Sequence, residues 1–311
     1  MPDALLIVSF GGPEQHEDVM PFLENVTRGR GIPQERLLSV AEHYHHFGGR
    51  SPINDQNREL IAALREKVNL PIYWGNRNWR PFLTDAMRQM QSDGIGRAAA
   101  FITSAFGSWS GCRQYLEDID QARAACGGGA PQVDALPLFG NHPAFIEAFA
   151  DRLGESLRKF TRTPHVAFTA HSVPLSMAET SPYVRQLERA CAGVAAVTGL
   201  TDWKLVYQSR SGPPTQPWLE PDILDHIRER AAEGVRDVII APIGFISDHM
   251  EVLYDLDTEA AALCDELGIT MQRCRTVGTH ARFIDLIVSQ IGEQRSCEAG
   301  CCPRPARPVA R

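Results

Sequence analysis

Short apolar runs alternate along the whole chain with longer segments in which apolar residues recur at helical spacing. The apolar runs predict strands at residues 5–10, 71–75, 97–103, 132–136, 166–170, 204–208, 237–243 and 269–273. The longer segments predict helices at residues 17–26, 34–45, 57–68, 80–92, 111–125, 143–160, 183–198, 223–234, 250–267 and 281–294. Apolar strands that alternate with amphipathic helices are typical of α/β proteins, in which parallel sheets carry helices on both faces.

The strands and helices fall into two successive series, which the long helix at 143–160 could connect. Two parallel sheets are therefore expected. The two halves show no close internal sequence repeat. In folds of this kind the active site lies at the carboxyl ends of the strands. The chemically rich segments of this chain follow strands in this way, at residues 9–13, 103–112, 171–174, 208–218 and 246–251.

Composition narrows the class of protein. The chain has 311 residues, of which 43% are hydrophobic and 22% charged, and its formal net charge is −7. Nucleic-acid binding relies on basic surface, so this charge disfavours it. No apolar run approaches the roughly 18–20 residues that span a bilayer, and the N-terminus lacks the basic start of a signal peptide. We expect a cytoplasmic protein, in which the eight cysteines do not form a disulfide framework.

A histidine follows the predicted strand at 166–170. That strand would deliver His171 to its carboxyl end, and Pro174 stops its simple continuation. A histidine in this position can act as a base near neutral pH or bind a metal. The alternative is that its ring nitrogens cap a turn.

Three carboxylates recur every four residues in the predicted helix at 250–267. Ser247 or Asp248 is a plausible N-cap, and Glu251, Asp255 and Glu259 then share one helix face. At ~1.5 Å rise per residue they form a row roughly 12 Å long. The alternative is a solvated acidic face, which the helix dipole favours anyway. Because the row directly follows an apolar strand, a site for a divalent cation such as Fe²⁺ is the sharper hypothesis.

Other loops hold candidate ligand contacts. A proline-rich loop carries Trp218, either as a core residue or as the apolar wall of a cleft. Glycine-rich turns in the first half allow close backbone approach and lie near arginines that could pair with ligand carboxylates. The alternatives are ordinary turns and solvated arginines. Neither the dinucleotide pattern Gly-x-Gly-x-x-Gly nor a Gly-Lys-Ser/Thr phosphate loop occurs, which disfavours NAD and ATP.

Over nearly its full length the chain resembles the ferrochelatases. The resemblance rests on the order of its motifs: Phe10-Gly11-Gly12-Pro13, Gly48-Gly49-x-Ser51-Pro52, Ala170-His171-Ser172-x-Pro174, Gln208-Ser209 through Trp218-Leu219, and Ser247-Asp248-His249-x-Glu251. Residues 24–31, 75–79 and 208–214 look like the actinobacterial branch of that family.

The resemblance implies two Rossmann-like domains with a porphyrin cleft between them. We expect residues 1–141 and 276–296 to form the first domain, 142–275 the second and 297–311 a cysteine-containing tail. The two catalytic residues implied are His171, as acceptor of pyrrole protons or ligand to iron, and Glu251, as its partner across the cleft. The metal site would comprise this pair, with Asp255 and Glu259 as an acidic track.

The resemblance also implies which residues hold the porphyrin. They are Phe10, Arg28, Arg30, Ser51 and Trp218. Some bacterial relatives have tyrosine at the position of Phe10, where a hydroxyl can reach iron. Phenylalanine lacks that oxygen, so Phe10 is expected to be an apolar contact and not a ligand.

Three cysteines near the C-terminus suggest metal ligation. Several ferrochelatases carry a [2Fe–2S] cluster held by three C-terminal cysteines and one internal one. The resemblance therefore implies Cys297, Cys301 and Cys302 as ligands, with Cys112 as the fourth. The spacing differs from that of better-known members. A zinc site or an unligated tail are the alternatives.

The expected activity is insertion of Fe²⁺ into coproporphyrin III to give coproheme, since the actinobacterial resemblance implies this substrate. Protoporphyrin IX is the alternative substrate. A non-catalytic porphyrin carrier and a chelatase for Co²⁺ or Ni²⁺ are the alternative functions. The resemblance also implies a monomer, and a later enzyme of haem synthesis could be a partner.

Overall fold

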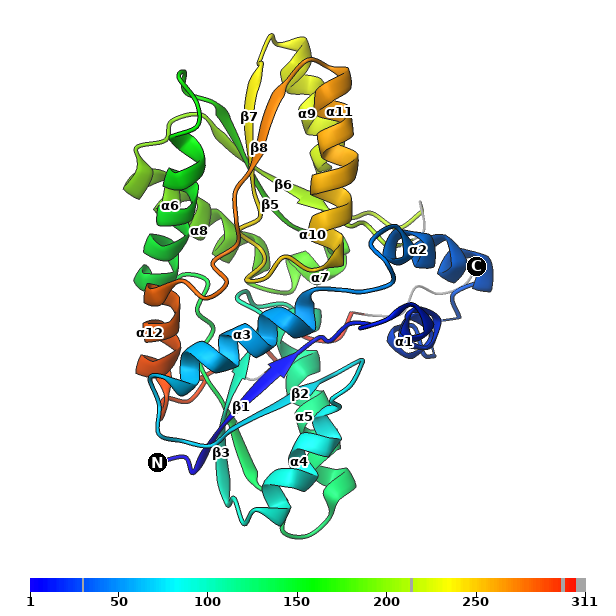
Figure 1. Ribbon diagram of the computed structural model, residues 1–311, viewed down its shortest axis with the longest axis vertical. Helices are drawn as coiled ribbons and strands as arrows, with labels where there is room; N and C mark the ends of the chain where they lie inside the picture. The colour runs from blue at the N-terminus through cyan, green and yellow to red at the C-terminus, as the bar shows by residue number, and fades with distance from the viewer. Residues whose placement is uncertain (30, 213–214, 298–299, 306–311) are drawn as a thin grey trace.

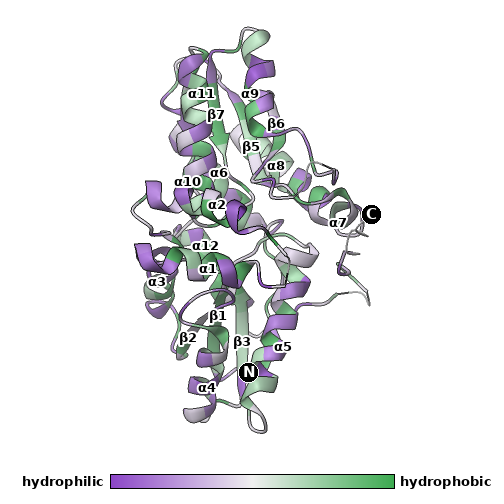
Figure 2. Ribbon diagram, turned by 90° about the vertical axis from the view of Figure 1, so that its right-hand side faces the viewer, coloured by the Kyte–Doolittle hydropathy of each residue, from purple (hydrophilic) through white to green (hydrophobic). Residues whose placement is uncertain are grey.

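The computed structural model describes residues 1–29, 31–212, 215–297 and 300–305. Two parallel four-stranded sheets lie one above the other, each with helices on both faces (Figure 1). The strands are mainly hydrophobic and the helices carry most of the hydrophilic residues (Figure 2). The α/β architecture with two sheets, expected from the sequence, is therefore confirmed. Among the described residues, no helix is both long enough and apolar enough to cross a bilayer.

The first sheet is built around the fully buried strand β1 (Ala4–Ser9). Its strand order is β2-β1-β3-β4, with β2 at Ile72–Asn76, β3 at Arg97–Ile102 and β4 at Gln132–Ala135. Alternate residues of β1 point to opposite faces, as the pleat requires. One set packs under α4 (Leu83–Ser92) and α5 (Gln114–Cys126), and the other packs under α3 (Ile53–Arg65).

The second sheet repeats this plan around β5 (His165–His171). Its order is β6-β5-β7-β8, with β6 at Trp203–Gln208, β7 at Asp237–Ala241 and β8 at Thr270–Arg273. One face is covered by α9 (Ile223–Ala232), α10 (Met250–Tyr254) and α11 (Ala261–Glu266). The other face packs on α6 (Pro143–Leu157) and α8 (Tyr183–Thr198).

A shared aromatic core joins the two sheets. Phe101 of the first sheet and Phe168 of the second belong to one continuous cluster of buried residues. Phe145 and Phe149 of α6 lie between them, and Phe283 of α12 (Ala281–Gln290) contacts both Phe101 and Phe145. The returning helix α12 also packs on α6 and α3. Burial of these rings fixes the two sheets relative to each other.

A small helical layer leaves the first sheet after β1. It comprises a short 3₁₀ turn (His16–Asp18), α1 (Val19–Val26) and α2 (Gln34–His46), and it has its own core around Phe22. Helix α2 reaches α10 of the second sheet (Figure 1), where the rings of His43 and Tyr254 stack with centroids 3.6 Å apart. This layer therefore bridges the two sheets on the side where the strands end.

The predicted strands all exist, with ends within two residues of those expected. The helices differ more. The expected single helix at 250–267 is α10, a π-helical segment η3 (Asp255–Ala260) and α11. A second π-helical segment, η2 (Trp109–Arg113), precedes α5, and a five-residue helix, α7 (Leu175–Glu179), was not predicted. Hydrophobic periodicity cannot resolve elements this short or distinguish a π turn from an α turn.

Close packing at the end of β7 yields a testable prediction. A Cβ atom at Gly244 would lie 2.7 Å from both Cα and Cβ of Ala170, the residue before His171. We expect Gly244→Ala to lower the free energy of unfolding by about 2 kcal/mol, because this backbone cannot yield without moving β5. Denaturant unfolding measures the change. Gly128→Ala is the control, since a Cβ there meets nothing within 4 Å. Equal stability of the two variants would contradict the packing argument.

Candidate active site

His171 ends the central strand of the second sheet and is held from both sides. Its Nδ1–H donates to the carbonyl oxygen of Ser172 at 2.5 Å, and its own carbonyl accepts from the Tyr183 hydroxyl at 3.0 Å. The backbone N–H of Ser172 donates to Gln208 O of the neighbouring strand at 2.7 Å. With Nδ1 engaged, the ring presents Nε2 to the carboxyl end of the sheet.

Glu251 meets this nitrogen from the first turn of α10. Its Oε1 lies 3.6 Å from His171 Nε2. Its other oxygen, Oε2, lies 3.5 Å from Nε2 of His249, whose Nδ1 caps α10 by accepting from the Val252 N–H at 3.3 Å. Each carboxylate oxygen therefore faces one imidazole. The sequence motif contained His249, but its role was missed, because a histidine N-cap has no distinctive sequence signal.

The 3.6 Å separation corrects one expectation. A flat macrocycle between the two groups would need roughly 3.5 Å on each of its faces, or about 7 Å in all. His171 and Glu251 therefore do not face each other across a ligand. They form one paired group on the second sheet.

The contact between the two groups raises the pKa of His171 and lowers that of Glu251. Burial opposes charge on His171, but the Glu251 carboxylate outweighs it and raises the pKa of the ring to about 9. Burial would raise the pKa of Glu251, yet His171 and His249 lower it to about 2. Burial lowers the pKa of His249. Near neutral pH these shifts favour an imidazolium on His171 against an ionised Glu251 carboxylate.

The predicted acidic row continues along the π-helical segment. Asp255 accepts hydrogen bonds from the Ser209 hydroxyl and, at 3.3 Å, from Gln208 Nε2. Burial, followed by the repulsion of Glu251 and Glu259, raises its pKa to about 7. Glu259 is mostly exposed, and its slight burial, followed by the repulsion of Asp222, raises its pKa. The row therefore runs from the paired group to the surface, but on a π turn instead of the ideal α-helix expected.

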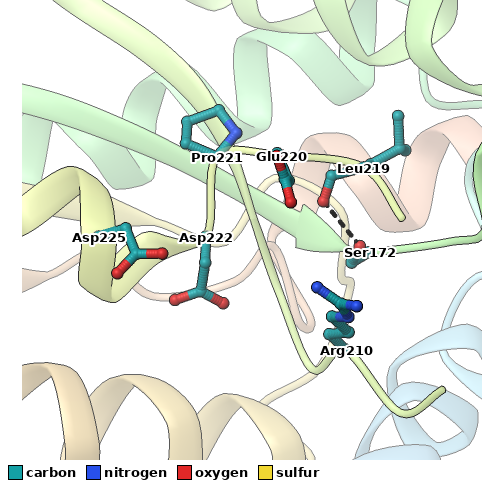
Figure 3. A pocket seen from close by; sticks show the side chains of 7 residues that line it. All are labelled: Ser172, Arg210, Leu219, Glu220, Pro221, Asp222 and Asp225. Carbon is teal, nitrogen blue, oxygen red and sulfur yellow. Dashed lines mark hydrogen bonds between the residues drawn. The ribbon is translucent and has the colours of Figure 1, made fainter. Parts of the chain in front are cut away.

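A cavity of about 430 Å³ adjoins the site on the side of the proline-rich loop (Figure 3). Ser172, next to His171, lines it, and its hydroxyl donates to Leu219 O at 2.9 Å. The rest of the lining is mostly charged: Arg210, Leu219, Glu220, Pro221, Asp222 and Asp225.

The expected porphyrin contacts lie in two places. Trp218 is buried, forms a β-bridge with Pro174 and so stands beside the His171 loop. On the first sheet's side, Phe10 is 36% exposed and Ser51 is buried, with its hydroxyl accepting from the Ile53 N–H at 3.5 Å. Arg28 is exposed after α1. Arg30 lies outside the described residues. The porphyrin roles of all five remain predictions.

The tail thiols gather around η2. The Sγ atoms of Cys301 and Cys302 are 3.5 Å apart, and Cys302 hydrogen-bonds to Cys112. Cys297, although exposed, interacts with Cys301. The chain thus brings the four expected cysteines together. Arg295 donates to Cys112 Sγ at 3.2 Å. As the side chains stand, no three His, Cys, Asp or Glu in the described part of the chain are arranged to hold a metal ion.

Comparison with solved structures defines the class of fold. The sirohydrochlorin chelatase SirB from Bacillus subtilis subspecies spizizenii, in complex with cobalt, superposes with a TM-score of 0.56 at 11% sequence identity. The match covers 94% of this chain and 95% of that one. The fold is therefore the chelatase fold.

Sequence comparison defines the family. The ferrochelatase family model matches residues 2–295. A ferrochelatase from Rhodopirellula baltica is 54% identical over 94% of this chain and 86% of its own length. A coproporphyrin III ferrochelatase from Streptomyces coelicolor is 49% identical over 99% and 95% respectively. The chain belongs to the ferrochelatase family.

The paired group predicts how stability depends on pH. The raised pKa of His171 gives stability that is complete below pH 6.5 and is lost as pH rises through about 9. The lowered pKa of Glu251 gives stability that is complete above pH 4.5 and is lost as pH falls through about 2. Glu251→Gln should therefore destabilise the protein most between about pH 4.5 and 6.5. Asp255 should also make the stability loss in Glu251→Gln smaller at higher pH. Its repulsion of Glu251 grows as it ionises near pH 7, and the substitution removes that repulsion.

Thermal unfolding of the metal-free protein in a chelator, at several pH values, measures this difference. Glu266→Gln, on an exposed residue of α11, is the control and should show little dependence on pH. A Glu251→Gln deficit that stays constant from pH 5 to pH 10 would contradict the ion pair.

Proposed function

We propose that this protein inserts Fe²⁺ into coproporphyrin III to give coproheme. One observation carries the proposal: an imidazole and a carboxylate meet at 3.6 Å at the carboxyl end of the second sheet. Metal insertion has to remove two pyrrole protons while the metal loses its water. A nitrogen base beside a carboxylate supplies both a proton acceptor and ligands for the ion.

The pKa values suggest an order of events. With its pKa raised to about 9, His171 is mostly protonated near neutral pH and is therefore a poor base before the metal binds. When Fe²⁺ binds to the Glu251 carboxylate, the metal neutralises the charge that holds this proton. The pKa of the ring then falls toward its ordinary value, and its proton leaves to the acidic row or to solvent. The freed Nε2 accepts one pyrrole proton, passes it on in the same way, and then accepts the second. His171 and Glu251 thus act in sequence on one side of the macrocycle.

The acidic row gives the released protons a route outward. Asp255 has a pKa of about 7, so it can both accept and release a proton near neutral pH. It neighbours Glu251 on one side and Glu259, which is exposed, on the other. The same carboxylates could pass Fe²⁺ inward, since oxygen ligands suit this cation. The roles of Asp255 and Glu259 are part of the proposal.

The choice of porphyrin rests on relatives and on charge. Relatives that match nearly the whole chain are named coproporphyrin III ferrochelatases. Coproporphyrin III carries four propionates, which favours a site with several cationic contacts such as Arg28 and Arg30. Protoporphyrin IX, with two, remains the second candidate.

Removing either member of the paired group should abolish insertion. We expect His171→Ala and Glu251→Gln each to reduce turnover at least a hundredfold, because each removes a group that acts on the reacting atoms. An anaerobic assay with Fe²⁺ and either coproporphyrin III or protoporphyrin IX, followed by absorbance, measures the rates. Coproporphyrin III should react faster.

The assay also separates the alternatives. Glu266→Gln, far along the same helical stretch, should retain full turnover. Tight porphyrin binding without insertion by the wild-type protein would instead indicate a carrier. Unchanged turnover in both His171→Ala and Glu251→Gln would discard the mechanism, and faster insertion of Co²⁺ or Ni²⁺ would reassign the metal.

We further propose that Cys112, Cys297, Cys301 and Cys302 hold a [2Fe–2S] cluster. Four thiolates are the ligands such a cluster needs, so the chemistry of the donors suits it, although among the described residues the thiols are not arranged to hold a metal ion. Three contacts link the four thiols into one chain, and Arg295 and Arg113 lie beside them. Arginines next to the sulfurs would stabilise a negatively charged cluster. When bound, the cluster would supply structural or regulatory chemistry, since insertion itself needs no electron transfer.

The visible spectrum tests the cluster. Anaerobically purified protein should be coloured and contain iron and acid-labile sulfide, and Cys112→Ser or Cys301→Ser should lose both. Cys126→Ser, in α5 and outside the thiol group, should keep them. Colourless protein that contains zinc would indicate the zinc alternative, and protein without either metal would indicate an unligated tail.

The remaining expectations stay part of this proposal. They are the domain limits, with residues 1–141 and 276–296 in one domain and 142–275 in the other, the monomeric state, the cytoplasmic location and a haem-pathway partner. Packing of α12 on α6 as well as on α3 means that the returning helix contributes to both sides of the expected boundary.

A further inference from the structure

The loop that presents Glu251 is held by a residue from the other half of the molecule. Gln56, in the first turn of α3, donates from Nε2 to the carbonyl oxygen of Asp248 at 3.2 Å. Its Oε1 accepts from the backbone N–H of the same residue at 2.7 Å. The two residues are 192 positions apart. One side-chain amide thus satisfies both main-chain groups of Asp248, as a neighbouring strand would.

The side chain of Asp248 continues this network within the second sheet. Its Oδ1 accepts from Arg273, at the end of β8, at 2.9 Å. The same guanidinium donates from Nε to Asp257 Oδ1 at 2.5 Å. Asp257 belongs to the π-helical segment that also carries Asp255. Asp248 is therefore fixed through its backbone by α3 and through its carboxylate by β8.

Asp248 directly precedes the cap of α10. His249 is that cap, and Glu251 follows in the first turn. A shift of Asp248 therefore moves the carboxylate that faces His171. Helix α3 begins two residues after Ser51, on the side of the first sheet where porphyrin contacts are expected. The Gln56 amide consequently connects this side of the first sheet to the turn that carries the Glu251 carboxylate.

We infer that Gln56 is a positioning residue for metal insertion, which sets Glu251 against the porphyrin through the backbone of Asp248. The inference rests on the proposed function. Gln56 itself touches neither reacting group. Its two hydrogen bonds set the distance between the first sheet and the Glu251 turn, and a displacement of about 1 Å at a reacting group can cost up to a hundredfold in rate.

Gln56→Met tests the inference, because methionine matches the length and volume of glutamine but cannot make either hydrogen bond. We expect kcat to fall about tenfold, with Zn²⁺ or Fe²⁺ as the metal. The dissociation constant for coproporphyrin III, measured by fluorescence quenching, should change less than twofold, and the unfolding temperature should stay within about 3 °C. A merely structural role would lower the unfolding temperature and leave kcat of the folded protein unchanged.

Two further variants complete the design. Gln56→Asn keeps the amide but is one methylene shorter, so it should also lose kcat and provides a second test if Gln56→Met folds poorly. Glu59→Met, exposed on the same helix, is the matched control and should match wild type. Wild-type rates in both Gln56→Met and Gln56→Asn would overturn this inference but leave the proposed function standing. Absence of insertion by the wild-type protein would instead overturn the proposed function.

Discussion

The contact between His171 and Glu251 is the interaction around which the rest of the site is arranged. Neither group has its ordinary pKa, because each sets the charge of the other: the ring is raised to about 9 and the carboxylate lowered to about 2. In the proposed mechanism this pair becomes reactive when a cation replaces the proton. Under the proposed function a divalent metal would be both substrate and trigger, because it would displace the proton that occupies the base.

The fold supplies this contact because two loops leave adjacent strands at the same edge of a sheet. β5 ends in His171, and β7, its neighbour, leads through Gly244 into the turn that presents Glu251. Parallel strands bring their carboxyl ends together, so groups far apart in sequence meet without a long connection. Gly244 permits the approach, since any side chain there would strike Ala170. The close packing of Gly244 on Ala170 is thus also what brings the Glu251 turn near His171.

The sequence predicted the strands well because a buried parallel strand is an uninterrupted apolar run, and that signal needs no tertiary information. It also placed His171 and Glu251 after strands. It could not predict their 3.6 Å contact, the π turn at Asp255 or the amide bridge from Gln56. These depend on distances between segments that lie far apart in the chain. A glutamine that hydrogen-bonds to a distant backbone has no local pattern, because any polar side chain on that helix face would look the same.

The π-helical segment shows why such details matter for chemistry. One extra residue per turn shifts the face on which Asp255 lies relative to a regular helix. In this position Asp255 accepts hydrogen bonds from Ser209 and Gln208 and lies half-buried next to the Glu251 carboxylate. Its partial burial and the repulsion of that carboxylate raise its pKa to about 7. A regular α-helix built from the same residues would space the three carboxylates evenly on one face. In the irregular turn Glu251 and Asp255 are half-buried and Glu259 is exposed, and the pKa rises from about 2 at Glu251 to about 7 at Asp255. Under the proposed function this difference in pKa would let a proton or a cation move along the row, whereas identical ionised carboxylates would hold either one equally well at every position.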